Sequence, residues 1–486
     1  AVNLVGAVAN MIHPLSAEKE IEFYLNESES VLAITLDQFY DKVVEARKAC
    51  DHQVIIIMAN VADELPVYLK YPFIIKQGGK YSGYPNKSYS LSWKEFIHMG
   101  KKYPLPLPKI SFRIDRTAAI LYSGGTTGTS KGIELTDLNF NALSIETVAR
   151  ALGANREPGD KILAVMPVFH GFGLGIGIHT CITNCISLIL IPQFNVKTYA
   201  HELLKKKPNY IAGVPTLYEA LLRTPGMENA DLSFLKGMFS GGDSLSQELK
   251  QKVDTFLKEH KATIEVLEGY GTTETVTACC LSPIGAYKPG SIGTPFPDHT
   301  FNICTPGTTE VVPVGSEGEI CISGPLVMKG YLKNEEETAN DLRLHDDGKV
   351  YVHTGDLGYM DEDNYVFFKQ RIKRMIITSG YNVYPSQIEN VIDGHPKVLM
   401  SCVIGVKDPY RVQKVKAFVV LRDGIVADDS IRSEIIDYCT QRVAKYAVPR
   451  EIEFRNELPK TLVGKVAYRV LEEEEEAKQA AAETAE

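Results

Sequence analysis

Residues 123–132 read SGGTTGTSKG and contain four glycines, three threonines, two serines and one lysine. Glycine allows backbone N–H groups to turn inward and to approach an anion closely. The hydroxyls of Ser123, Thr126 and Thr127 add donors, and Lys131 adds a positive charge. We therefore predict that this stretch binds phosphate groups, although a flexible surface turn can have the same composition.

The segments around this loop are those expected of a phosphate site. Residues 117–122, TAAILY, are typical of a buried strand, and residues 135–152, LTDLNFNALSIETVARAL, have the pattern of an amphipathic helix with Thr136 as its N-cap. A strand, a glycine-rich loop and a helix in this order favour phosphate binding. The loop is not a P-loop, because Ser130 precedes Lys131 and Gly132 follows it.

A second group of polar residues follows other expected strands. In LEGYGTTET, residues 267–275, Tyr270 could stack on a planar base, Thr273 could bond a phosphate oxygen and Glu274 could hold Mg²⁺. In HTGDLG, residues 353–358, Asp356 could accept both hydroxyls of a ribose, or could form an Asx turn. Lys465 lies in a turn just after a glycine.

The composition narrows the classes of function. The 486 residues are 44% hydrophobic and 23% charged, as in a globular protein of two to four folding units. The net charge of −9 gives no general attraction for nucleic acid or anionic membranes. No apolar run approaches the ~18–20 residues of a membrane span, and no signal peptide is visible. The odd number of cysteines, in apolar surroundings, fits a reduced cytosol, so we predict a cytoplasmic location. The nine cysteines form no C-x-x-C, so their spacing predicts no zinc site.

The order of the expected elements indicates an α/β fold with a doubly covered, mostly parallel sheet. Apolar runs typical of strands alternate with helical patterns and lie at 161–168, 186–192, 209–214 and 236–240. Prolines and glycines after residue 285 predict a small β subdomain. We place an N-terminal domain at 1–370, a mobile α+β C-terminal domain at 371–470 and an acidic tail at 471–486.

Six segments occur in the order found in the adenylate-forming enzymes: YSGGTTGTSKG, MPVFHGFGL, GYGTTE, HTGDLG, QRIKRMIITSGYNVYPSQIE and PKTLVGKVAY. The similarity covers the chain from residue 1 to about residue 470. The chain thus resembles the AMP-binding superfamily of acyl- and aryl-CoA synthetases, peptide-synthetase adenylation domains and firefly luciferase. The resemblance implies that ATP and Mg²⁺ convert a carboxylic acid into an acyl-adenylate with release of pyrophosphate. A thiol then takes the acyl group.

The resemblance also assigns residues to the nucleotide. The departing phosphates would contact residues of the glycine-rich loop, namely Ser123, Gly125, Thr126, Thr127, Gly128 and Lys131. The adenine would be bordered by residues of two glycine turns, namely Gly242, Asp243, Tyr270 and Gly271. Asp356 and Arg371 would bind the ribose.

The remaining assignments concern catalysis and domain movement. By resemblance, Thr273 would contact the α-phosphate, Glu274 would hold Mg²⁺, and Lys465 would bridge the substrate carboxylate and the α-phosphate. Lys373 matches the hinge about which the C-terminal domain turns between the half-reactions, and Gly380 would border the path of the pantetheine thiol. The loop serine at 130 stands where the family usually has proline, and residue 463 is valine where serine is usual.

The sequence VFHGFGLG around His170 resembles acyl- and aryl-CoA ligases, including 4-coumarate and fatty-acid CoA ligases. This resemblance implies a catalytic role for His170. The alternative is a structural histidine at a strand end whose hydrogen bonds are satisfied within the protein. The aspartate that holds an amino acid in peptide-synthetase domains is missing here. Small and apolar residues of the expected pocket predict an uncharged aryl or aliphatic acid: Gly171, Phe172, Gly173, Val214, Gly269, Val276 and Ala278.

We therefore predict an acid:CoA ligase that uses ATP, Mg²⁺ and coenzyme A and binds a small carboxylic acid of fatty-acid or aromatic-acid metabolism. Three alternatives stay open: a ligase that loads a separate acyl-carrier protein, a luciferase-like oxygenase, and a truncated, non-catalytic nucleotide-binding homologue. The last one arises because the sequence begins without methionine, and we expect the first part of the N-terminal domain to be lacking.

Overall fold

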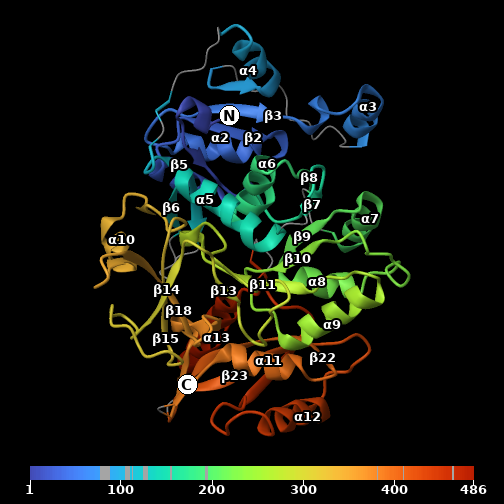
Figure 1. Cartoon of the computed structure of the whole chain (residues 1–486), viewed down its shortest axis with the longest axis vertical. Helices are drawn as coiled ribbons and strands as arrows, with labels where there is room; N and C mark the ends of the chain where they lie inside the picture. The colour runs from blue at the N-terminus through green and yellow to red at the C-terminus, as the bar shows by residue number, and fades with distance from the viewer. Residues whose placement is uncertain are drawn as a thin grey trace. The chain divides into compact units, whose positions relative to one another are not determined.

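The computed structural model describes residues 1–76, 88–103, 110–111, 113–123, 130–153, 156–191, 195–379, 381–408, 410–461 and 465–485. These residues form two compact units, which are coloured by residue number in Figure 1. The first unit comprises residues 1–139 and 328–339, and the second comprises residues 140–327 and 340–486. None of the described helices combines the length and the apolar character needed to cross a membrane.

The first unit contains two sheets. One has the order β1-β5-β6-β16 and consists of Ala9–Asn10, Thr117–Ser123, Lys131–Thr136 and Gly330–Tyr331. The other is parallel and consists of β2 (Leu32–Leu36), β3 (Ile55–Ala59) and β4 (Ser90–Ser92). The helices of this unit are α1 (Glu18–Glu27), α2 (Tyr40–Lys48), α3 (Val67–Lys76) and α4 (Trp93–Gly100).

The surroundings of the glycine-rich loop differ from the predicted strand, loop and helix. The residues after the loop form strand β6, which pairs antiparallel with β5, so the loop joins two strands. The helix α5 (Asp137–Thr147) begins only after β6. Its predicted cap is confirmed, because the Asn139 backbone N–H donates to the Thr136 hydroxyl (3.2 Å) and the Thr136 N–H donates to Asn139 Oδ1 (2.7 Å).

The second unit is built on a seven-stranded sheet with the order β13-β12-β11-β10-β9-β7-β8. Its strands are β7 (Lys161–Ala164), β8 (Ser187–Leu190), β9 (Tyr210–Gly213), β10 (Gly237–Ser240), β11 (Val266–Tyr270), β12 (Cys280–Leu281) and β13 (Thr294–Pro295). The strands β8, β7, β9, β10 and β11 are parallel to one another, whereas β12 pairs antiparallel with both β11 and β13. The predicted mostly parallel sheet is thereby confirmed.

Residues on this sheet alternate between two covered faces, as the twofold period of a strand requires. Leu163, Ile211 and Met238 are fully buried against the helices α7 (Val196–Lys206), α8 (Pro215–Leu222) and α9 (Gln247–Glu259). The neighbouring residues Ile162 and Phe239 face an apolar pocket on the other side. That side is covered by α5, by α6 (Cys181–Thr183) and by π-helical turns at Val148–Leu152 and Phe172–Thr180.

A second, antiparallel sheet forms the small β subdomain. It consists of β14 (Thr300–Cys304), β15 (Gly318–Ser323), β17 (Leu342–Leu344), β18 (Val350–Met360) and β19 (Val366–Arg371). The helix α10 (Glu335–Asp341), most of which belongs to the first unit, precedes β17. The long strand β18 pairs with β15, β17 and β19. It therefore lies at the centre of this subdomain.

The C-terminal part has its own sheet, with β20 (Ile376–Thr378), β21 (Tyr381–Val383), β22 (Val398–Asp408), β23 (Val412–Leu421) and β24 (Glu451–Arg455). One face is packed against α11 (Pro385–Asp393) and α12 (Asp429–Thr440). The other face packs against the start of α13 (Tyr468–Ala485), where Leu471 is fully buried. Together the three sheets of this unit and their helices confirm the predicted α/β class.

Candidate active site

The centre of the site is a carboxylate on β18. Asp356 is buried, the Tyr270 hydroxyl donates to its Oδ2 (2.7 Å), and Arg371 Nε lies 3.2 Å from its Oδ1. Strand register explains the second contact, because Asp356 and Arg371 are direct partners in the antiparallel pair β18–β19. Burial raises the pKa of Asp356, and the positive charge of Arg371 opposes this shift.

One oxygen of Asp356 keeps unused hydrogen-bonding capacity. Among the described residues no donor forms a well-directed hydrogen bond to Asp356 Oδ1, although Arg371 Nε is near. A buried carboxylate oxygen without a donor is costly in a folded protein. The hydroxyls of a ribose would satisfy it, so this atom fits the predicted nucleotide.

The turn after β11 holds two further predicted residues. A Cβ atom on Gly271 would lie 2.3 Å from the Thr277 carbonyl oxygen, so only glycine fits there. The following turn at Thr273–Thr275 ends at Val276, which has a φ of +63°. A β-branched residue rarely adopts this conformation, and strain of this kind is typical of functional turns. The close packing thus fixes the positions of Thr273 and Glu274.

Lys465 extends into the same region from the C-terminal part. Its Cε lies 3.6 Å from the position that a Cβ atom would take on Gly242, which has a φ of +84°. Desolvation lowers the pKa of the Lys465 ammonium and the nearby positive charge of Arg371 adds to this, whereas Asp243 and Asp356 oppose it. The charged groups predicted for nucleotide binding and for catalysis therefore surround this lysine.

His170 lies just before the π-helical turn at Phe172–Thr180. The Phe172 backbone N–H donates to its Nδ1 (3.2 Å), which leaves Nε2 as the protonated nitrogen of a neutral ring. Desolvation, with the charge of Lys465, lowers the pKa of His170 to about 4. His170 is thus a neutral hydrogen-bond donor at physiological pH and not a cation.

Glu268 belongs to the site's surroundings and was not predicted from the sequence. It is buried on β11, and its Oε1 accepts a hydrogen bond from the Leu245 backbone N–H (3.0 Å). Burial raises its pKa to about 7, and the negative charge of Asp243 adds to this. The sequence signal was a carboxylate inside an otherwise apolar strand, two residues before Tyr270.

An apolar pocket begins beside Gly242. Its residues are almost all hydrophobic or glycine, with Ala151, Leu152, Ile162, Phe172, Ile176, Ile186, Ala212, Phe239, Gly241, Leu281 and Phe296 among them. Tyr210 and Gly213 are three residues apart on β9, so a pocket from the strand ends to Tyr210 runs about 10 Å along the sheet.

Sequence reasoning found only part of this lining. Phe172, Gly269 and Ala278 line the pocket as predicted, whereas the other four predicted residues, all described in the structure, are not among the lining residues: Gly171, Gly173, Val214 and Val276. A Cβ atom on Gly173 would lie 2.1 Å from the Pro167 carbonyl oxygen. This glycine is therefore needed for the close approach of two backbone segments.

The remaining predicted residues fall in three groups. Ser123 and Lys131 face each other across the β5–β6 pair of the first unit, where Lys131 Nζ lies 2.6 Å from Glu337. Lys373 lies in a short 3₁₀ turn that follows β19. The last group lies outside the described residues and comprises Gly125, Thr126, Thr127, Gly128, Gly380 and Val463.

Two family models match the chain. The model of the AMP-binding enzyme matches residues 1–332, and that of the AMP-binding enzyme C-terminal domain matches residues 387–465. The chain therefore belongs to the AMP-binding enzymes, and the predicted family is confirmed. This agreement supports an ATP-dependent activation of a carboxylic acid, which is the reaction implied by the six motifs.

Relatives and solved structures agree with this placement. The chain is 36% identical to a long-chain-fatty-acid–CoA ligase of Bacillus subtilis (strain 168), over 98% of this chain and 82% of that protein. It is 32% identical to a long-chain-fatty-acid–CoA ligase of Haemophilus influenzae, over 97% of this chain and 82% of that protein. The ATP-bound RpMatB-BxBclM chimera B1 is 27% identical with a TM-score of 0.80 over 96% and 84%. The anthranilate CoA ligase AuaEII shares the fold, with a TM-score of 0.82 at 23% identity over 99% and 84%.

Proposed function

We propose that this chain is an ATP-dependent long-chain fatty acid:CoA ligase. The apolar pocket supports an aliphatic acid as the substrate, because it begins at Gly242 near Lys465 and reaches Tyr210 in the sheet without a charged residue in its lining. An aliphatic tail fills such a space by hydrophobic burial alone. The names of the curated relatives support a fatty acid over an aromatic acid as the substrate.

In the first step, the acid carboxylate would lie at the mouth of the pocket. Lys465 would neutralise the negative charge that develops when this carboxylate attacks the α-phosphate. His170 would donate a hydrogen bond from Nε2, because its low pKa keeps the ring neutral. Both groups act before thiol transfer, and the product is an acyl-adenylate with pyrophosphate as the leaving group.

The nucleotide would be held by the polar side of the site. Asp356 Oδ1 would accept a ribose hydroxyl, and the adenine would lie between Tyr270 and the turn at Gly242 and Asp243. Glu274 fits a Mg²⁺ ion, since its carboxylate is a hard oxygen ligand on a rigid turn. The ion would supply charge neutralisation at the phosphates.

In the second step, coenzyme A would take the acyl group. We place the hinge of the C-terminal part at Lys373 and the thiol path at Gly380. Turning about this hinge would withdraw Lys465 from the nucleotide and admit the thiol. The thiol would attack the acyl carbon and release AMP.

The test is carboxylate-dependent ATP–pyrophosphate exchange with saturated acids of increasing length, benzoate and 4-coumarate. We expect exchange with long-chain acids, strongly reduced exchange with both aromatic acids, and an acyl-CoA thioester when coenzyme A is added. If the rate of ATP–pyrophosphate exchange were highest with an aromatic acid, the substrate assignment would be wrong. Acyl transfer to a holo acyl-carrier protein but not to coenzyme A would overturn the acceptor.

A further inference from the structure

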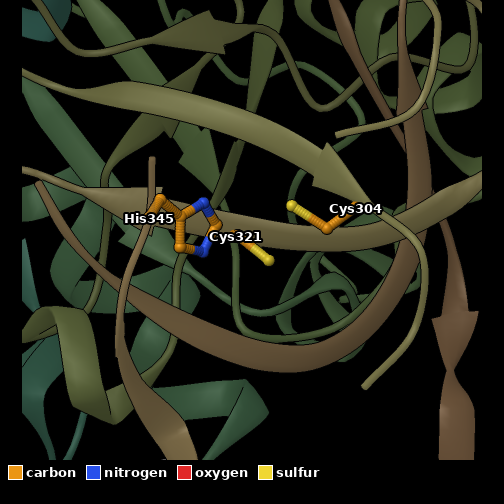
Figure 2. A group of neighbouring side chains, drawn as sticks. All are labelled: Cys304, Cys321 and His345. Carbon is orange, nitrogen blue, oxygen red and sulfur yellow. The ribbon is translucent and has the colours of Figure 1, made fainter. Parts of the chain in front are cut away.

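The small β subdomain contains a buried group of sulfur and nitrogen ligands that the proposed reaction does not use. Cys304 ends β14, Cys321 lies in β15 and His345 follows β17 (Figure 2). His353 lies in β18. Strand register brings them together, because Cys321 pairs directly with His353, and Cys304 is the diagonal neighbour of Cys321 on the same face. Four separate segments therefore contribute one side chain each.

The ligand atoms of Cys304, Cys321 and His345 form one close group, and Cys321 and His353 form a second one with Glu319. The two sulfur atoms and a ring nitrogen of His345 all lie within 4.8 Å of one another, and Figure 2 shows the Cys304 sulfur directed toward the other two side chains. His353 Nε2 lies 3.0 Å from His345 Nε2 and 3.7 Å from Cys321 Sγ. Both cysteines are fully buried and both are free thiols, and at most 5% of either histidine is exposed.

A carboxylate and an aromatic ring hold the two histidines. Glu319 Oε2 lies 3.0 Å from His353 Nδ1, and Glu319 Oε1 accepts the Gly355 N–H (2.9 Å). A carboxylate on Nδ1 fixes Nδ1 as the protonated nitrogen and leaves the lone pair of Nε2 directed at His345. The His345 ring stacks on Tyr351 with 4.1 Å between centroids. This is the support that a metal-binding histidine has in proteins.

We propose that Cys304, Cys321, His345 and His353 bind a structural Zn²⁺ ion. Two thiolates and two imidazoles are a donor set that zinc prefers, with a tetrahedral arrangement. Two thiolates also balance the charge of the ion. Binding breaks the two S–H bonds and releases two protons to solvent, with no change of oxidation state.

The location gives this ion a structural role in the nucleotide site. His353 precedes Asp356 by three residues on the same strand, and Glu319, which holds His353, also accepts the N–H of Gly355. An ion that ties β14, β15 and β18 together would fix the strand that presents the ribose carboxylate. The expected consequence of zinc loss is a less stable subdomain and weaker nucleotide binding.

The experiment uses the full chain, purified without an affinity tag, dialysed and analysed for metals by mass spectrometry. We expect about one zinc ion per chain, and loss of that zinc in the Cys304→Ser and His345→Ala variants. His345→Cys replaces one zinc ligand with another and is expected to retain the ion. Cys439→Ser changes a buried cysteine of the C-terminal core and should also retain it.

A second measurement does not depend on any variant. Replacement of the ion by Co²⁺ in the unaltered chain is expected to give the visible and near-ultraviolet bands of tetrahedral thiolate coordination. Lack of a bound metal together with lack of these bands would overturn the proposal, as would zinc retention by His345→Ala.

Discussion

The proposed nucleotide side of the active site and the proposed acyl pocket meet at Gly242, yet they are built in opposite ways. The nucleotide side consists of charged and polar groups that contact one another, such as Asp356, Tyr270 and Arg371. The pocket is lined mostly by alkyl and aromatic side chains and glycines, with a few hydroxyl groups and no charged group. The first recognises its ligand by directed hydrogen bonds, and the second by shape and burial.

This difference has a consequence for substitutions. A hydrogen-bonding group on the nucleotide side has one position in which it works, so its loss affects the reaction of every acid equally. An apolar side chain of the pocket contributes volume, so its replacement affects acids according to their length. Each of the following predictions tests whether the two regions behave independently.

The largest effect is expected from Lys465→Ala on the nucleotide side. Loss of a charge that is placed for the transition state reduces ATP–pyrophosphate exchange by about 10²–10³-fold, for long and short acids alike. Thioester formation from a supplied acyl-adenylate is expected to change little, because the lysine serves the first step. Lys460→Ala, an exposed lysine before the same turn, is the control. Equal losses in both half-reactions would contradict the assignment.

A smaller effect is expected from Asp356→Asn. The amide keeps the shape of the side chain but loses the negative charge, and a hydrogen bond to a charged group contributes about 1.5–3 kcal/mol. We expect the KM for ATP to rise about 10–100-fold, while the preference among acids is unchanged. Initial rates at varied ATP measure this. Asp363→Asn, an exposed carboxylate near the end of the same strand, should leave KM unaltered.

The pocket is tested by Ala212→Leu. Ala212 is buried on β9 and lines the pocket, so added methylene groups there occupy space that a long acyl chain needs. We expect the ratio of kcat/KM for palmitate over hexanoate to fall at least about tenfold, with KM for ATP unchanged. Ala200→Leu overpacks the core on the other face of the same sheet and should leave this ratio as it is. A similar fall in both variants would point to general destabilisation.

The same contrast explains what could be predicted from the sequence. The polar residues lie in short contiguous motifs, so Tyr270, Asp356 and Arg371 could be predicted to form one site, and the structure shows that they contact one another. Pocket residues such as Ala151 and Ile162 come from segments that look like ordinary core, because burial in a core and burial against a ligand require the same side chains. The class of fold followed from the alternation of strand and helix patterns.

Two features could not be found from the sequence because the pairing of strands creates them. The order of motifs did not reveal that the glycine-rich loop runs into a strand, since the run KGIELT has the composition of either element. The cysteines and histidines of the β subdomain lie far apart along the chain, at 304, 321, 345 and 353. Spacing rules detect only ligands that lie near one another in the sequence.

The smallest effect concerns Glu268, which lies at the border of the two regions. Its pKa of about 7 in the folded chain exceeds the ordinary value of 4.5, so between these values the folded carboxyl is protonated while the unfolded one is ionised. Unfolding then releases a proton, and the stability of the folded chain falls as the pH rises through this window. Above the folded pKa no further loss is expected.

Glu268→Gln removes this titration and keeps the acceptor for the Leu245 N–H. We expect its stability relative to the unaltered chain to increase by about 1 kcal/mol between about pH 5.5 and about pH 6.5, as measured by denaturant unfolding. Glu259→Gln, an exposed carboxylate at the end of α9, should show no such trend. If the Gln variant follows the pH dependence of the unaltered chain, then Glu268 is ionised in the folded state and the border of the pocket is more polar than its lining indicates.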